Sequence, residues 1–129
     1  MPIVGLGTDI AQIDRLEAAF ARRGDRLLER LFTAHEREYC DRRQARRFDH
    51  YAGRFAVKEA VMKVLGTGWR RGVRWVDIEV LRAPGAAPQL RLHGESARIA
   101  ERLGIDRIHI TITHDAGLAM AVAVGESDA

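Results

Sequence analysis

The spacing of apolar residues changes along this 129-residue chain, and that change constrains the fold more than any other feature. After a first short strand pattern, apolar residues recur every three or four positions up to Gly66, as on amphipathic helices. In the second half they mostly alternate with polar or small residues, as in half-buried strands. We expect strands over residues 3–10, 76–80, 90–92, 108–113 and 118–124, and helices over 13–23, 34–43, 48–65 and 95–103.

Helices concentrated early and strands concentrated late predict an α+β fold, with a mainly antiparallel sheet packed against the long helix over 48–65. Gly66 follows that helix where a C-cap glycine belongs. No repeat, low-complexity tract or linker divides the chain, so residues 1–129 are expected to form a single domain.

The composition is typical of a soluble globular protein, with 47% hydrophobic and 30% charged residues. The single cysteine, Cys40, excludes an internal disulfide and favours a reducing compartment. No apolar run is long enough to cross a membrane, and the N-terminus lacks the pattern of a signal peptide. We therefore expect a cytoplasmic protein without a membrane partner.

Positive charge gathers in the first part of the chain. Residues 1–75 carry 16 Lys and Arg against 10 Asp and Glu, whereas residues 76–129 carry 5 against 8. This imbalance indicates either a solubilising surface or an anionic partner, such as a phosphorylated cofactor, an acidic protein or a nucleic acid. A small basic RNA-binding module is thus an alternative, but aromatic residues make up only 6% and none alternate with basic residues as stacking platforms do.

Asp9 lies at the end of the first expected strand, where aspartate is disfavoured. Gly5 and Gly7 share its face, and glycine in a strand often marks close approach by a ligand or another backbone. Asp9 is therefore a candidate to hold a metal or a phosphate-linked group. The alternative is an Asx turn or a helix N-cap, because a helix is expected soon afterwards.

The long helix carries charged residues outside its apolar stripe. Glu59 and Lys63 are neighbours one turn apart, and Arg54 and Lys58 form an adjacent pair. A carboxylate beside several cations suits a site that handles magnesium and a pyrophosphate, although ordinary surface pairs have the same spacing. Of 21 basic residues only Lys58 and Lys63 are lysines, which indicates that the compact, titratable lysine charge is needed there.

Several weaker candidates surround these residues. The Gly66-Thr67-Gly68 segment could bind phosphate through backbone N–H groups or could simply cap the helix. His114, at the end of a strand, could contact phosphate or could be structural. Arg15, Arg22 and Arg26 could dock an acidic partner helix or form a solvated face. A tighter cluster could bind a nucleotide phosphate or nucleic acid: Arg42, Arg43, Arg46 and Arg47.

Together these segments resemble the holo-acyl-carrier-protein synthase branch of the phosphopantetheinyl transferases. The resemblance spans nearly the whole chain in the family's order, and each motif alone is weak. The matching segments are residues 5–10 (Gly-Leu-Gly-Thr-Asp-Ile), 54–60 (Arg-Phe-Ala-Val-Lys-Glu-Ala), Lys63 with 65–68 (Leu-Gly-Thr-Gly), 75–80 (Trp-Val-Asp-Ile-Glu-Val) and 112–114 (Ile-Thr-His).

The resemblance implies that Asp9 and Glu59 coordinate Mg²⁺ with the pyrophosphate of coenzyme A, and that Lys63 lies near the bond that breaks. It also implies a homotrimer with active sites between neighbouring subunits. Coenzyme A contacts are expected from Arg46, Arg47, Arg54, Gly66, Thr67, Gly68 and His114, and carrier contacts from Arg15, Arg22 and Arg26. The chain departs from the family pattern at three places. Val61-Met62 replaces the more usual aromatic and small residues, Thr111 and Thr113 replace serines, and a local insertion lies near Arg23-Gly24.

The implied reaction supports fatty acid synthesis. A serine hydroxyl of apo-acyl-carrier protein attacks the β-phosphate of coenzyme A, giving holo-carrier and adenosine 3′,5′-bisphosphate. Either Glu59 or a metal-bound water could act as the general base. Two alternatives to this reaction stay open. One is a transferase that serves the carrier of a polyketide or peptide synthetase, and the other is a non-catalytic oligomeric scaffold that packs through the face of Ala119, Ala121 and Ala123.

Overall fold

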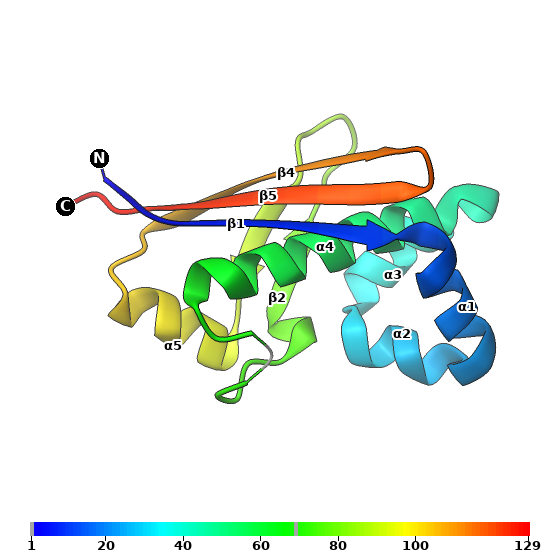
Figure 1. Ribbon diagram of the computed structural model, residues 1–129, viewed down its shortest axis with the longest axis horizontal. Coiled ribbons are helices and arrows are strands. Elements are labelled where there is room, and N and C mark those ends of the chain that lie inside the picture. Colours follow the sequence, from blue (N-terminus) through cyan, green and yellow to red (C-terminus); the bar gives the residue numbers. More distant parts are fainter. Residues whose placement is uncertain (1, 69) are drawn as a thin grey trace.

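The structure is a computed structural model that describes residues 2–68 and 70–129 (Figure 1). Its long helix lies under a three-stranded sheet, and shorter helices lie on the side of the long helix that faces away from this sheet. The elements are β1 (Ile3–Gln12), α1 (Ile13–Arg23), α2 (Asp25–Leu31), α3 (Ala34–Asp41), the 3-10 turn η1 (Gln44–Arg46), α4 (Arg47–Leu65), the 3-10 turn η2 (Trp75–Asp77), β2 (Ile78–Leu81), β3 (Gln89–Leu92), α5 (Gly94–Arg102), β4 (Arg107–Asp115) and β5 (Leu118–Glu126).

The sheet has the strand order β1-β5-β4, and both of its pairings are antiparallel. β2 and β3 form a separate antiparallel ladder. The predicted α+β fold with an antiparallel sheet on a long helix is thus confirmed. Among the described residues, no helix is long and apolar enough to cross a membrane.

Small residues allow α4 to pack very closely against the sheet. A Cβ atom added to Gly7 of β1 would lie 2.0 Å from the carbonyl oxygen of Ala60, and one added to Gly5 would lie 3.2 Å from that of Val64. On β5, Ala121 is buried against the same helix. The glycine face of β1 was therefore predicted correctly as a site of close approach, and the approaching group is a helix backbone.

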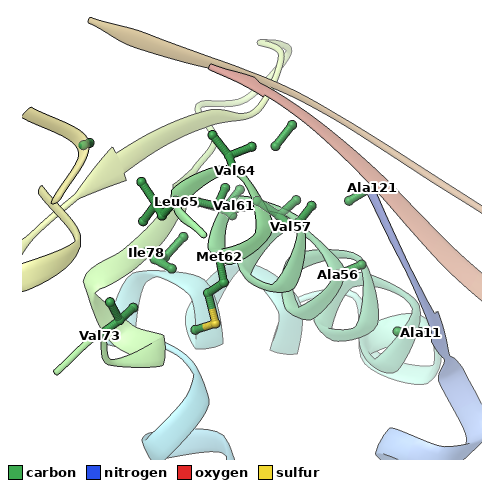
Figure 2. Packing of buried hydrophobic residues seen from close by; sticks show 14 of the residues in the cluster. Ala11, Ala56, Val57, Val61, Met62, Val64, Leu65, Val73, Ile78 and Ala121 are labelled. Carbon is green, nitrogen blue, oxygen red and sulfur yellow. The ribbon is translucent and has the colours of Figure 1, made fainter. Parts of the chain in front are cut away.

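The hydrophobic core extends along α4 on both sides. Figure 2 shows Val57, Val61 and Val64 on the helix below the strand that carries Ala121, while Met62 points to the opposite side. A second cluster lies between α2, α3 and the first half of α4; its buried members are Leu28, Leu31, Phe32, Cys40, Phe48 and Tyr51. Burial raises the pKa of the Cys40 thiol to about 12, so this residue is the small buried side chain that the sequence indicated.

The α2 helix was not predicted. Gly24 ends α1 with φ +71, and Asp25 begins a separate seven-residue helix whose Leu28 and Leu31 are buried. Arg26 therefore lies on a different helix from Arg15 and Arg22, and the continuous arginine face expected from the sequence is interrupted.

The outer face of the three-stranded sheet is apolar and exposed. On β1, 67% of Leu6 and 60% of Ile10 are accessible, and Met120 of β5 is also exposed. The alanine face proposed for a scaffold points the other way: Ala119 and Ala121 are at most 1% accessible, because α4 covers them. Any association through this sheet must therefore use its outer face.

Candidate active site

Asp9 and Lys63 meet where β1 crosses α4. The Lys63 Nζ donates to the carbonyl oxygen of Thr8 at 2.8 Å and lies 3.4 Å from Asp9 Oδ1. Glu59 lies one helical turn before Lys63. The close contact between Gly7 and Ala60 brings these elements together, since it sets the distance between β1 and this turn of α4.

Glu59 is half-buried beside a second carboxylate. Its pKa is raised above the usual value of a glutamate by burial and by the negative charge of Asp9, and the Lys63 ammonium opposes both effects. The two carboxylates therefore lie close enough to repel each other. Together with one lysine, they are the three residues that the sequence assigned to the chemistry.

The Gly66-Thr67-Gly68 segment begins three residues after Lys63. Gly66 is a left-handed C-cap, and its N–H donates to the Lys63 carbonyl at 3.2 Å. The Thr67 N–H donates to the Met62 carbonyl at 3.1 Å, and its hydroxyl donates to the Gly68 carbonyl. These two N–H groups are therefore used within the helix cap, and the segment adjoins the site through its exposed glycines.

Lys58 does not join this site, although the sequence paired it with Arg54 beside Glu59. Its ammonium is completely buried and lies 2.9 Å from Glu36 Oε1, and it also donates to the carbonyl oxygens of Trp75 and Ile78. Burial lowers the pKa of Lys58, and the Glu36 carboxylate opposes that shift. The two lysines of the chain thus have different surroundings, one at the acidic site and one in the core.

The remaining basic candidates lie in the N-terminal half of α4 or just before it. Arg46 pairs with Asp49 at 3.3 Å, and Arg47 pairs with Asp41 at 3.1 Å. Arg54 is only 2% accessible, and its guanidinium lies over the Tyr39 ring at 4.2 Å. The Arg54 Nε is buried without a hydrogen-bond partner among the described residues. Arg54 is nine residues before Lys63, which is about 14 Å along the helix axis.

His114 lies close to this basic end. Its ring is 5.5 Å from that of His50, in an edge-to-face arrangement. Burial, helped by the positive charge of Arg54, lowers the pKa of His50 to about 4. His114 also lines a hollow of about 310 Å³ with Arg46, and three aspartates, Asp14, Asp49 and Asp115, share that hollow.

A larger groove of about 700 Å³ begins at Ile10, directly after Asp9. Apolar residues line much of it, and three arginines lie along it. Leu16, Leu27, Phe55 and Trp75 belong to the apolar lining, and the arginines are Arg15, Arg23 and Arg30. Of the arginines predicted to dock a partner, only Arg15 lines the groove; Arg22 and Arg26 are exposed on the adjoining helices.

Sequence reasoning missed Tyr39, an aromatic residue against which two of the arginines pack. The Arg43 guanidinium lies over the Tyr39 ring at 3.7 Å, and Arg54 approaches the same ring. The spacing of four residues between Tyr39 and Arg43 was the available signal, because such residues are neighbours on one helix face. Arg54, from another helix, gave no local signal.

Comparison with known proteins identifies the family of the chain. The model of the 4'-phosphopantetheinyl transferase superfamily matches residues 5–123. The chain is 48% identical over 125 residues to a holo-[acyl-carrier-protein] synthase of Solibacter usitatus, covering 97% of this chain and 99% of the relative. A synthase of Desulforudis audaxviator is 44% identical over 128 residues, covering 98% and 96%.

Solved structures show the same fold. A Helicobacter pylori holo-[acyl-carrier-protein] synthase in complex with coenzyme A superposes with a TM-score of 0.81 at 32% identity, covering 94% of this chain and 99% of that one. A Bacillus anthracis synthase, in complex with coenzyme A (3',5'-ADP), gives 0.79 at 34% identity, covering 98% of each chain. With its fold, its acidic pair beside Lys63 and these relatives, the chain belongs to the holo-[acyl-carrier-protein] synthases of the 4'-phosphopantetheinyl transferase superfamily.

Proposed function

We propose that Asp9 and Glu59 together hold Mg²⁺ while the chain carries out the reaction of its family, transfer of 4'-phosphopantetheine from coenzyme A to a serine of apo-acyl-carrier protein. The observation that carries this proposal is that Asp9 of β1 meets Glu59 and Lys63 of α4, which are distant from it in sequence, where the two elements cross. Family membership accounts for the basic half of the chain through an anionic substrate, in place of the RNA-binding alternative.

The donor set fits magnesium. Mg²⁺ prefers hard oxygen ligands and is commonly bound by one or two carboxylates together with substrate phosphates and waters. Asp9 and Glu59 supply two carboxylates whose mutual repulsion a divalent cation would relieve, as the raised pKa of Glu59 indicates. When bound, the ion would neutralise the pyrophosphate and polarise the phosphorus that is attacked.

Lys63 is placed to act on the phosphate that leaves. Its side chain is 55% accessible, and its ammonium donates to the Thr8 carbonyl and lies beside Asp9. In this position it would stabilise negative charge on the departing adenosine bisphosphate or donate a proton to it. Glu59, with its raised pKa, is a candidate to accept the proton of the carrier serine, and a bound water is the other candidate.

The direct test is mass spectrometry of an apo-acyl-carrier protein incubated with the protein, coenzyme A and Mg²⁺. We expect the carrier to gain one phosphopantetheine group, and we expect Asp9→Asn and chelation of the metal each to prevent that gain. An unmodified carrier, under conditions in which the wild-type protein is folded, would contradict the proposed function.

Replacing Lys63 by arginine tests whether a compact ammonium is needed. Lys63→Arg keeps the positive charge but spreads it over a planar group, so we expect kcat to fall by about 10²-fold or more while the thermal midpoint stays near that of wild type. Arg70→Lys, at an exposed arginine, is the matched control and should leave kcat unchanged. A Lys63→Arg enzyme with normal kcat would reduce the role of Lys63 to its charge alone.

Coenzyme A contacts are proposed at both ends of α4. Gly66, Thr67 and Gly68 follow Lys63 at the C-terminal end. Arg54 lies about 14 Å from Lys63 along the helix axis, and Arg47 lies about 24 Å from it at the N-terminal end, next to Arg46. His114 shares a hollow with Arg46. We propose that a homotrimer brings the acidic end of one subunit beside the basic end of the next. The exposed apolar face of the sheet, which includes Leu6, Ile10 and Met120, supports such an assembly.

We propose that the groove beginning at Ile10 receives the acyl carrier protein. Its apolar lining and flanking arginines suit an amphipathic helix with acidic residues, and its position next to Asp9 would bring the carrier serine to the acidic site. Arg22 and Arg26 remain part of this proposed docking surface, beside the groove on α1 and α2.

Charge reversal tests the docking surface. We expect Arg15→Glu and Arg23→Glu each to raise KM for the carrier by about tenfold, and to leave KM for coenzyme A unchanged, because both side chains line the groove and repel an acidic partner when reversed. Arg98→Glu, on α5 away from the groove, is the control. Equal increases in KM for the carrier and in KM for coenzyme A would contradict a specific role of these arginines in carrier docking.

A further inference from the structure

The buried ion pair between Lys58 and Glu36 adjoins the acidic site in sequence, because Lys58 immediately precedes Glu59 on α4. Both side chains are completely inaccessible, and the Lys58 ammonium uses all three of its protons, on Glu36 Oε1 and on the carbonyl oxygens of Trp75 and Ile78. A guanidinium is planar and larger, so this arrangement of three acceptors around one nitrogen explains why a chain rich in arginine has a lysine here.

Glu36 extends this network to two more backbone groups. Its Oε1 accepts from the Thr33 N–H at 2.8 Å, which completes the capping box of α3, and its Oε2 accepts from the Val80 N–H at 2.8 Å. Two buried charges thereby join the start of α3, the middle of α4, η2 and β2. These segments are held as one body on the side of α4 that is opposite the sheet.

The position of Lys58 determines where the next residue can point. Successive residues on a helix are rotated by about 100°, so fixing Lys58 against Glu36, Trp75 and Ile78 fixes the direction of Glu59 around the axis of α4. On the other side, the contact between Gly7 and Ala60 fixes the distance to β1. Glu59 is thus held between two constraints, one from each side of the helix.

We propose that Lys58 and Glu36 are positioning residues, which hold α4 in the rotation that places Glu59 opposite Asp9. This inference rests on the proposed metal site at Asp9 and Glu59. Partners that orient metal ligands from behind commonly change metal affinity by about 10–100-fold when they are removed. Both side chains are completely inaccessible, so we expect them to act on the site through the orientation of Glu59.

The test is a charge-neutral double variant, Glu36→Gln with Lys58→Met, since buried ion pairs can often be replaced by well-packed neutral residues without loss of folding. We expect the variant to be folded by circular dichroism, with an affinity for Mn²⁺, measured by electron paramagnetic resonance, at least about tenfold weaker than that of wild type. We also expect faster amide exchange over residues 57–63 in the absence of metal, which reports the looser helix independently of metal binding.

Ile105→Ala is the matched control, because it removes core packing far along the chain from this network and should destabilise the fold without changing Mn²⁺ affinity. Should the double variant fail to fold, Glu36→Asp keeps both charges, shortens one side chain and should still weaken Mn²⁺ binding severalfold. A folded variant that binds Mn²⁺ as tightly as wild type overturns the positioning role. If wild type and Asp9→Asn bind Mn²⁺ equally, the proposed metal site itself is wrong, and the positioning role is overturned with it.

Discussion

Replacing Glu59 by glutamine is expected to reduce phosphopantetheine transfer by about 10³-fold at saturating Mg²⁺, because one of the two proposed metal ligands and one candidate base are lost together. The amide keeps the size of the side chain, so the fold should be retained. The rate is measured as holo-carrier formed per minute, over a range of Mg²⁺ concentrations that reveals whether excess metal restores any activity.

The same substitution is expected to stabilise the metal-free protein at neutral pH. Burial and the charge of Asp9 raise the pKa of Glu59 in the folded state, so the ionised carboxylate costs stability once the pH rises through that pKa. Below the usual glutamate pKa the side chain is protonated in both states and this cost disappears. The thermal midpoint of Glu59→Gln should therefore exceed that of wild type at pH 7, and the difference should shrink toward pH 4.

Magnesium should reverse the order of the two thermal midpoints, so that wild type becomes more stable than Glu59→Gln. Wild type is stabilised by any ligand that binds only its folded form, whereas Glu59→Gln has lost much of the site and should gain little. Glu101→Gln, exposed on α5, provides the control for charge removal away from the site. Near-normal transfer by Glu59→Gln, or a midpoint below that of wild type at pH 7 without metal, would contradict the assignment of Glu59.

Local patterns in the sequence were sufficient for most elements of the fold. The alternation of apolar residues over 108–113 predicted β4, and the helix expected over 34–43 corresponds to α3, which begins with a capping box of Thr33 and Glu36. Both signals arise within one element. The α2 helix was missed, since only Leu28 and Leu31 of its seven residues are buried and the helix follows a glycine that looked like a local break.

The acidic site was found because unusual residues marked it, but the roles of its neighbours depend on tertiary contacts. Asp9 in a strand and two lysines among many arginines are visible without coordinates. Nothing local distinguishes Lys58 from Lys63, since each is a lysine on the same helix. Tertiary packing separates them: η2 and β2 pack around Lys58 and bury it, whereas β1 brings Asp9 to Lys63.

Gly7→Ala is expected to be among the most destabilising single substitutions in the chain. The new Cβ atom would lie 2.0 Å from the Ala60 carbonyl oxygen and 2.9 Å from its carbon, which are backbone atoms of α4 and cannot turn aside. β1 must therefore move away from the helix, which loses core packing and separates Asp9 from Glu59. We expect the free energy of unfolding, measured by urea titration, to fall by about 4 kcal/mol or more.

Gly5→Ala is the matched control, two residues earlier on the same face of β1. Its Cβ atom would lie 3.2 Å from the Val64 carbonyl oxygen, a contact that a shift of a few tenths of an ångström relieves, so we expect a loss of about 1 kcal/mol. Transfer activity should follow the same order, because only Gly7→Ala has to separate the acidic pair. Equal stability of the two variants would show that the contact between Gly7 and Ala60 does not set the distance between β1 and α4.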